Sequence, residues 1–264
     1  MSSPSKLFHA VTRTTVRRAL NIRRPHVLIA CMPKSASTFL ADAVSKLPGM
    51  RRVDLSWGMG PRREHTLDVV QLARRDLSSY VSAQHVRLSD DAEELIEEYH
   101  LTPVLLTRNL FDAVASVRDH FRDEAHTFPM TALAPEHASL PDAQLEELIA
   151  DLIIPWYVNF YVSWQDIDCL KVTYDQVRES PREVVASICQ RAGIKAEADE
   201  IERAVDAARA LGSRLRLNKG VSGRGGAISA RARDKIIALT RHFPKIDFGP
   251  VGVSNAMRAD TLQV

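Results

Sequence analysis

The sequence lacks the features expected of a membrane-spanning, secreted or metal-binding protein. It has no run of about 18 consecutive apolar residues, and its start lacks the apolar core of about 7 to 15 residues found in a secretory signal. Three cysteines are present, Cys31, Cys169 and Cys189, and no two of them have metal-binding or redox spacing. We therefore expect a cytoplasmic protein with reduced thiols, no metal site and no transmembrane span.

The composition indicates one globular domain with a charged extension. A length of 264 residues with 45% hydrophobic content is enough for one domain to bury its own core. Residues 1–24 contain six basic side chains and no acidic one: Lys6, Arg13, Arg17, Arg18, Arg23 and Arg24. We expect a basic extension (1–24), one domain (25–250) and a C-terminal tail (251–264).

The purpose of the basic extension stays open. A solvated segment, an organelle-targeting peptide and a segment that contacts an anionic membrane surface all have this composition. Because basic and aromatic residues are not interleaved in it, we expect no nucleic acid as a partner. The oligomeric state is also open.

Short apolar runs alternate with longer amphipathic patterns, which predicts a parallel sheet with helices on both faces. Strands are predicted at 26–31, 80–85, 103–107 and 169–173. Helices are predicted at 37–47, 89–99 and 181–192, and a further one at 142–164 that Pro155 should kink or split. Weak periodicity at 121–141 predicts a long loop that covers a binding site.

Residues 31–39 carry the most informative motif, because they follow the first predicted strand and open the first predicted helix. A helix N-terminus presents free N–H groups and a partial positive charge, which favour an anion. Lys34 adds a cation, and the neighbouring small and hydroxyl-bearing residues allow close approach of a ligand. The lysine precedes the small residues, so the order differs from the Walker A loop of nucleotide triphosphatases.

This segment resembles the 5'-phosphosulfate loop of the sulfotransferases, which use 3'-phosphoadenosine-5'-phosphosulfate (PAPS) and release adenosine 3',5'-bisphosphate (PAP). The family form is Pro-Lys-Ser-Gly-Thr-Thr-Trp, with Ala36 here in place of the glycine and Phe39 in place of the adenine-stacking tryptophan. The resemblance implies a P-loop-like three-layer fold and PAPS contacts from Lys34, Ser35, Ala36, Ser37, Thr38 and Phe39.

A second anion site is predicted after the third strand. Arg108 follows that strand and Ser116 lies about two helical turns later, so both can reach one phosphate. The segment resembles the family's 3'-phosphate motif, with Leu110 in place of its proline. Together with the first loop, this pairing favours a ligand with two phosphate groups.

Two looser segments agree with the same resemblance. Tyr174 lies where the family places a tyrosine on the adenine, although core packing explains it equally well. Lys219 and Gly220 resemble the late Arg-Lys-Gly loop that covers the 3'-phosphate, but Asn218 replaces its arginine. Whether Arg216 or Arg224 takes over that role stays open.

The resemblance also implies a mechanism. His85 ends the second predicted strand and matches the histidine base of the cytosolic sulfotransferases, although their assisting lysine is Ala83 here. Lys34 would stabilise the charge that develops on the leaving phosphate, without a metal. The acceptor would be a hydroxyl or amine of a small molecule or lipid.

Three questions remain at this level. The aromatic residues between Trp156 and Trp164 recur at helical spacing and would either fill the core or line an acceptor pocket. A P-loop-like nucleotide kinase is the rival enzyme, but it requires a Walker A order. A catalytically inactive PAP-binding or scaffold protein is the rival without activity, and retention of Lys34 and His85 argues against it.

Overall fold

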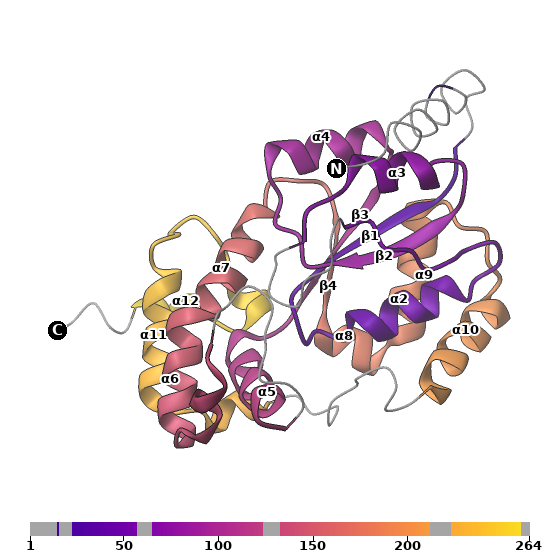
Figure 1. Ribbon diagram of the computed structural model, residues 1–264. Coiled ribbons are helices and arrows are strands. Elements are labelled where there is room, and N and C mark those ends of the chain that lie inside the picture. Colours follow the sequence, from indigo (N-terminus) through magenta and orange to yellow (C-terminus); the bar gives the residue numbers. More distant parts are fainter. Residues whose placement is uncertain (1–14, 16–22, 57–64, 124–132, 212–222, 260–264) are drawn as a thin grey trace.

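The computed structural model describes residues 15, 23–56, 65–123, 133–211 and 223–259. A four-stranded parallel sheet forms its centre, with helices on both faces (Figure 1). The strand order is β2-β1-β3-β4. The strands are β1 (His26–Cys31), β2 (Tyr80–Gln84), β3 (Thr102–Thr107) and β4 (Leu170–Thr173). The α/β class with a central parallel sheet, predicted from the sequence, is confirmed.

Strand β1 is buried on both faces, which explains its nearly continuous apolar sequence. Successive side chains of a strand point to opposite faces. Val27 and Ile29 accordingly belong to the core on one side of the sheet, while Leu28 and Ala30 belong to the core on the other. The sheet is therefore the middle layer of three.

Each face of the sheet is covered by its own set of helices. The Val27 face carries α2 (Ser37–Ser45), α8 (Tyr174–Glu179), α9 (Pro181–Ala192) and α10 (Ala198–Ala210). The Leu28 face carries α3 (Val69–Arg75), α4 (Asp90–Glu98), α5 (Leu110–Asp123), α6 (Asp142–Leu152), α7 (Ile154–Ser163) and α11 (Ala230–Thr240). Within the described residues, no helix is both long and apolar enough to cross a membrane.

Short elements complete the chain: the 3-10 turns η1 (Pro135–Ser139), η3 (Arg224–Ala227) and η4 (Gly249–Val251), and the helix α12 (Asn255–Ala259). The last of these lie against the body of the domain. Val251 and Val253 are fully buried in the core. The Arg258 guanidinium donates to the carbonyls of Thr240, Phe243 and Ile246. Residues 251–259 therefore pack against the domain, and the division at residue 250 stays a prediction.

Of two expectations about breaks between helices, one is met and the other differs in detail. The split at Pro155 occurs as expected, because α6 ends at Leu152 and the proline lies in the first turn of α7. The loop expected at 121–141 is shorter, because α5 continues to Asp123 and η1 occupies part of the remainder. Arg122 donates to the carbonyls of Ala138 and Leu140, which holds the end of α5 against this segment. Residues 124–132 lie outside the described part.

Candidate active site

The candidate residues gather at the carboxyl edge of the sheet. The segment with Lys34 follows β1, His85 follows β2, Arg108 follows β3 and Tyr174 follows β4. All four strands are parallel and pair in the order given above. Ligands of open α/β sheets bind outside this edge, so the topology brings together residues that are up to 140 positions apart, from Lys34 to Tyr174.

The Lys34 loop, residues 32–36, is held from several sides. The Met32 amide donates to the Leu106 carbonyl at 3.0 Å, and the Tyr157 hydroxyl donates to the Pro33 carbonyl at 3.0 Å. Ser35 is fully buried, and its hydroxyl donates back to the Met32 carbonyl at 2.6 Å. The loop is thus a fixed part of the core, and Ser35 serves its internal structure.

The backbone of the Lys34 loop has an unusual conformation. Lys34 has a φ of 62° and Ala36 a φ of 67°, in the left-handed region that favours glycine. Ala36 occupies the position where the sulfotransferase loop has glycine, so this alanine accepts a strained backbone. Ala36 is also the N-cap of α2 and provides no side-chain cap. A turn of this kind directs successive N–H groups into a concave site suited to an anion.

The hydroxyl and aromatic side chains that follow the loop divide into two groups. Ser37 and Thr38 are half-buried in the first turn of α2, beside the loop. Phe39 is 3% exposed and packs in the core on the Val27 face. Its ring therefore offers almost no surface for stacking on an adenine, the contact that its place in the motif implies.

Arg108 connects the ends of three strands. Its Nη1 donates to the Lys34 carbonyl at 2.5 Å, and its Cζ lies 4.3 Å from the centroid of the Tyr174 ring. The guanidinium is thereby oriented by a hydrogen bond on one side and by a cation–π contact on the other. Arg108 Nε is buried and has no hydrogen-bond partner among the described residues. Tyr174 is buried and its ring packs against this guanidinium, while its contact with an adenine stays a prediction.

Helix α5, which follows Arg108, carries two further residues of interest. Ser116 lies in the second turn of α5 and is 2% exposed. His120, one turn further, places Nδ1 3.4 Å from the Lys34 Nζ. His120 gave no signal in the sequence, because its contact with Lys34 spans 86 positions.

His85 is held by the neighbouring strand. Its Nδ1 lies 2.8 Å from the Cys31 carbonyl oxygen. Because a carbonyl only accepts, Nδ1 carries the proton and Nε2 of the neutral ring is left as a hydrogen-bond acceptor. Burial lowers the pKa of His85, and the bond to the Cys31 carbonyl opposes this only in part. The ring is therefore kept in its basic, uncharged form near neutral pH.

A second histidine, His65, lies beside His85. The rings of His65 and His85 are stacked with centroids 5.2 Å apart, and the His85 amide donates to His65 Nδ1 at 3.0 Å. His65 also donates its own amide to the His85 carbonyl. The sequence reasoning missed His65, since nothing in its local pattern marks it.

A cavity of about 640 Å³ is lined by His65, the partner of His85 in this stack. It lies between the segment that follows His85 and the first turns of α3 and α4. Its walls combine apolar and polar side chains, including His65, Leu67, Val86, Leu88, Glu94 and Leu95. Its volume suits a small organic molecule.

The aromatic residues of α7 support the site from the core. Tyr157, Phe160 and Trp164 are fully buried and Tyr161 nearly so, while Trp156 is half-buried. The Trp164 Nε1 donates to the Val86 carbonyl at 3.0 Å, beside His85. Apart from Trp156, these residues are therefore core side chains, and Tyr157 and Trp164 donate hydrogen bonds to the backbone of the candidate site.

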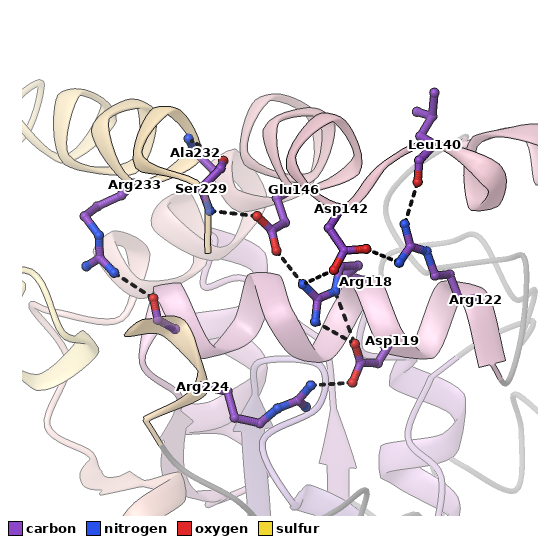
Figure 2. Close-up of polar contacts among 11 residues, drawn as sticks. Arg118, Asp119, Arg122, Leu140, Asp142, Glu146, Arg224, Ser229, Ala232 and Arg233 are labelled. Atoms are coloured by element: carbon purple, nitrogen blue, oxygen red, sulfur yellow. Dashed lines mark hydrogen bonds and ion pairs between the residues drawn. The ribbon is translucent and has the colours of Figure 1, made fainter. Parts of the chain in front are cut away.

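The late loop is described only in its second half. Asn218, Lys219 and Gly220 lie outside the described residues, as does Arg216. Arg224, in η3, forms an ion pair with Asp119 of α5. Figure 2 shows this pair as one end of a network in which Arg118 joins Asp119 to Glu146 and Asp142.

Comparison with known proteins supports the fold. No protein-family model and no curated protein matches the chain. The crystal structure of mouse sulfotransferase SULT7A1 complexed with PAP is similar over 86% of this chain and 88% of its own, with 17% identity and a TM-score of 0.61. A sulfotransferase from Alicyclobacillus acidocaldarius is similar over 74% of this chain and 100% of its own, with 16% identity and a TM-score of 0.42. The first likeness shows a shared P-loop-like fold, and the second is too distant to add to it.

Proposed function

We propose that the chain is a PAPS-dependent sulfotransferase that acts on a hydroxyl or amine of a small-molecule or lipid acceptor. The observation that carries this proposal is the contact between the Lys34 loop and Arg108, the two candidate anion sites of the sequence. The fold shared with a sulfotransferase supports it further.

The residues present fit a ligand with two separate anionic groups. The strained turn at Lys34 and Ala36, with the first turn of α2, provides N–H donors for a 5'-phosphosulfate. Arg108 uses Nη1 on the Lys34 carbonyl, which leaves the edge formed by Nε and Nη2. A 3'-phosphate that accepts from this edge in bidentate fashion would satisfy the buried Nε.

The chemistry follows from the positions of two side chains. PAPS, when bound, supplies an electrophilic sulfur and a phosphate leaving group. His85 takes the proton from the acceptor at Nε2, as the acceptor oxygen or nitrogen bonds to sulfur and the bond from sulfur to the 5'-phosphate oxygen breaks. Lys34 offsets the negative charge that develops on that phosphate oxygen. His65 and the Cys31 carbonyl keep His85 oriented and in the correct tautomer.

We assign the acceptor to the cavity beside His65. His65 lines this cavity and its ring stacks on that of the proposed base His85, which supports an acceptor bound near the base. Leu67, Val86 and Leu88 provide apolar contacts, and Glu94 adds a carboxylate to the lining. This mixture suits an amphiphilic acceptor with an apolar body and a polar end.

Calorimetric binding to the purified protein tests the proposal. We expect PAP to bind without a metal and more tightly than AMP, because only PAP has the 3'-phosphate that Arg108 would hold. ATP with magnesium serves as the comparison for a nucleotide kinase. A preference for ATP with magnesium would contradict the proposal and indicate phosphoryl transfer. Tight PAP binding without turnover of PAPS on any acceptor would favour an inactive PAP-binding protein.

A further inference from the structure

Helix α5 carries three buried polar residues on one face, and one of them is Ser116, the proposed phosphate contact. Asp112, Ser116 and Asp119 are spaced four and three residues apart, which places them on one face of the helix. Each is at most 9% exposed. Ser116 lies between the two carboxylates, about 6 Å along the helix axis from Asp112 and about 5 Å from Asp119.

The turn η3 and the preceding Gly223 form hydrogen bonds to the two carboxylates of this face. The Asp112 carboxylate accepts from the amides of Gly223 at 2.9 Å and Gly225 at 2.6 Å, which fixes the backbone on either side of Arg224. The Arg224 guanidinium reaches Asp119 through Nη2. The backbone beside Arg224 is thus tied to one end of this face and its guanidinium to the other. Figure 2 shows the Arg224 side chain extending along α5 to Asp119.

The ion pair with Asp119 also orients the Arg224 guanidinium so that it can bind an anion. Asp119 is shared with Arg118, whose Nε and Nη2 lie 3.2 Å and 3.1 Å from the same carboxylate. Arg118 is itself anchored on Glu146 at 2.5 Å. Asp119 is therefore a rigid acceptor that holds the Arg224 side chain extended through Nη2. The remaining donors of a planar guanidinium can then bind an oxyanion with little loss of side-chain entropy.

We propose that Arg224 binds the 3'-phosphate and replaces the arginine of the sulfotransferase Arg-Lys-Gly loop, whose place Asn218 takes in this sequence. Asp119 is the positioning residue of Arg224. This inference rests on the proposed function. The 3'-phosphate would lie between Arg108, which precedes α5, and Arg224, with Ser116 beneath it. Two guanidinium groups from opposite sides would give this site its preference for a doubly charged phosphate.

The test compares PAP with AMP, which lacks only the 3'-phosphate, on the wild type and on Arg224→Gln. We expect Arg224→Gln to weaken PAP binding by about tenfold to a hundredfold, the effect of one charge-assisted contact, and AMP binding by less than about threefold. Arg233→Gln is the matched control. Arg233 also holds η3, through the Gly225 carbonyl at 2.7 Å and the Phe111 ring, but its guanidinium lies far from Asp119, the residue that holds Arg224 (Figure 2). It should leave the ratio of the PAP and AMP affinities unchanged.

The outcomes separate the two proposals. If the wild type does not prefer PAP to AMP, the proposed function fails, whatever the variants do. If the wild type prefers PAP and Arg224→Gln keeps the same ratio, or if Arg233→Gln lowers the ratio equally, the assignment of Arg224 fails and the proposed function stands. Should Arg224→Gln not fold, Arg224→Lys decides instead. It keeps the charge near Asp119 but loses bidentate donation, so we expect a smaller drop in the ratio, and an unchanged ratio would overturn the assignment.

Discussion

The Nδ1 of His85 lies 2.8 Å from the carbonyl oxygen of Cys31, across the two neighbouring strands β2 and β1. Cys31 is the last residue of β1 and the Lys34 loop begins directly after it. One hydrogen bond therefore positions the proposed base relative to the proposed leaving-group loop. It also fixes the tautomer, because only the Nδ1–H form can donate to the carbonyl.

Activity should depend on pH through His85. Burial lowers the pKa of this histidine below the usual 6.5. The base has to be neutral, so kcat/KM should rise with pH, through a pKa below 6.5, and become level near neutral pH. The pH profile of PAPS-dependent turnover measures this directly. A profile that rises through a pKa above 7 would contradict the role of a buried, neutral His85.

Replacing the same residue separates chemistry from binding. His85→Ala should lower kcat by about 10²- to 10⁴-fold, the usual contribution of a general base. PAP affinity should change little, since the proposed phosphate contacts come from the Lys34 loop and Arg108. Calorimetry with PAP alongside the kinetic assay distinguishes these effects, and an equal loss in both would contradict the assignment of His85 as base.

The backbone of Ala36 predicts a stabilising substitution. Ala36→Gly should raise the free energy of unfolding by about 0.5–1 kcal/mol, because glycine adopts the φ of 67° without strain and is a better N-cap than alanine. Thermal or denaturant unfolding measures the change. Ala43→Gly, the same substitution in the middle of α2, should instead destabilise, since the helix interior favours alanine. Destabilisation by both variants would show that the turn at Ala36 is not strained.

The sequence allowed much of this site to be predicted because its central part is local. The β1 strand, the turn at Lys34 and the start of α2 are adjacent in the chain, and a buried strand followed by a helix start has a clear pattern. The ends of the other strands could be placed by topology alone. His85 and Arg108 are therefore predicted as candidates from their places at strand ends together with the resemblance to the sulfotransferase motifs.

The remaining contacts have no local signature. Nothing near His65 indicates that it stacks on His85, and His120 meets Lys34 only because α5 packs beside the loop. The burial of Phe39 depends on how α2 rests on the sheet, which a motif does not specify. In the same way, the burial of Val253 depends on its packing in the core that includes α11, which the sequence of the C-terminal segment does not indicate.

Acid should weaken the attachment of η3 to α5. Burial raises the pKa of Asp119, but hydrogen bonds and charges from Arg224 and Arg118 outweigh it, so the pKa is lowered overall. A carboxylate with a lowered folded-state pKa stabilises the fold above its unfolded pKa of about 3.9, and the stabilisation is lost as pH falls through the folded value. Asp119→Asn should therefore be less stable than the wild type at pH 7, by about 1 kcal/mol. The difference in melting temperature should shrink as pH falls from about 5 to 3, and a constant difference would contradict this role.

Gly225 lies where η3 passes closest to α5. A Cβ atom at this position would lie 2.4 Å from the Phe111 Cβ and 2.6 Å from the Asp112 amide nitrogen. Backbone cannot yield as a flexible side chain can, so Gly225→Ala should push η3 away from α5 and destabilise the protein by about 1–3 kcal/mol. The adjacent Gly226→Ala is the matched control, because its Cβ would meet nothing within 4 Å. Denaturant unfolding of both variants should show a loss only for the first. Equal stability of the two would mean that η3 does not pack on α5 in solution, and the extended position of Arg224 along α5 would lose its support.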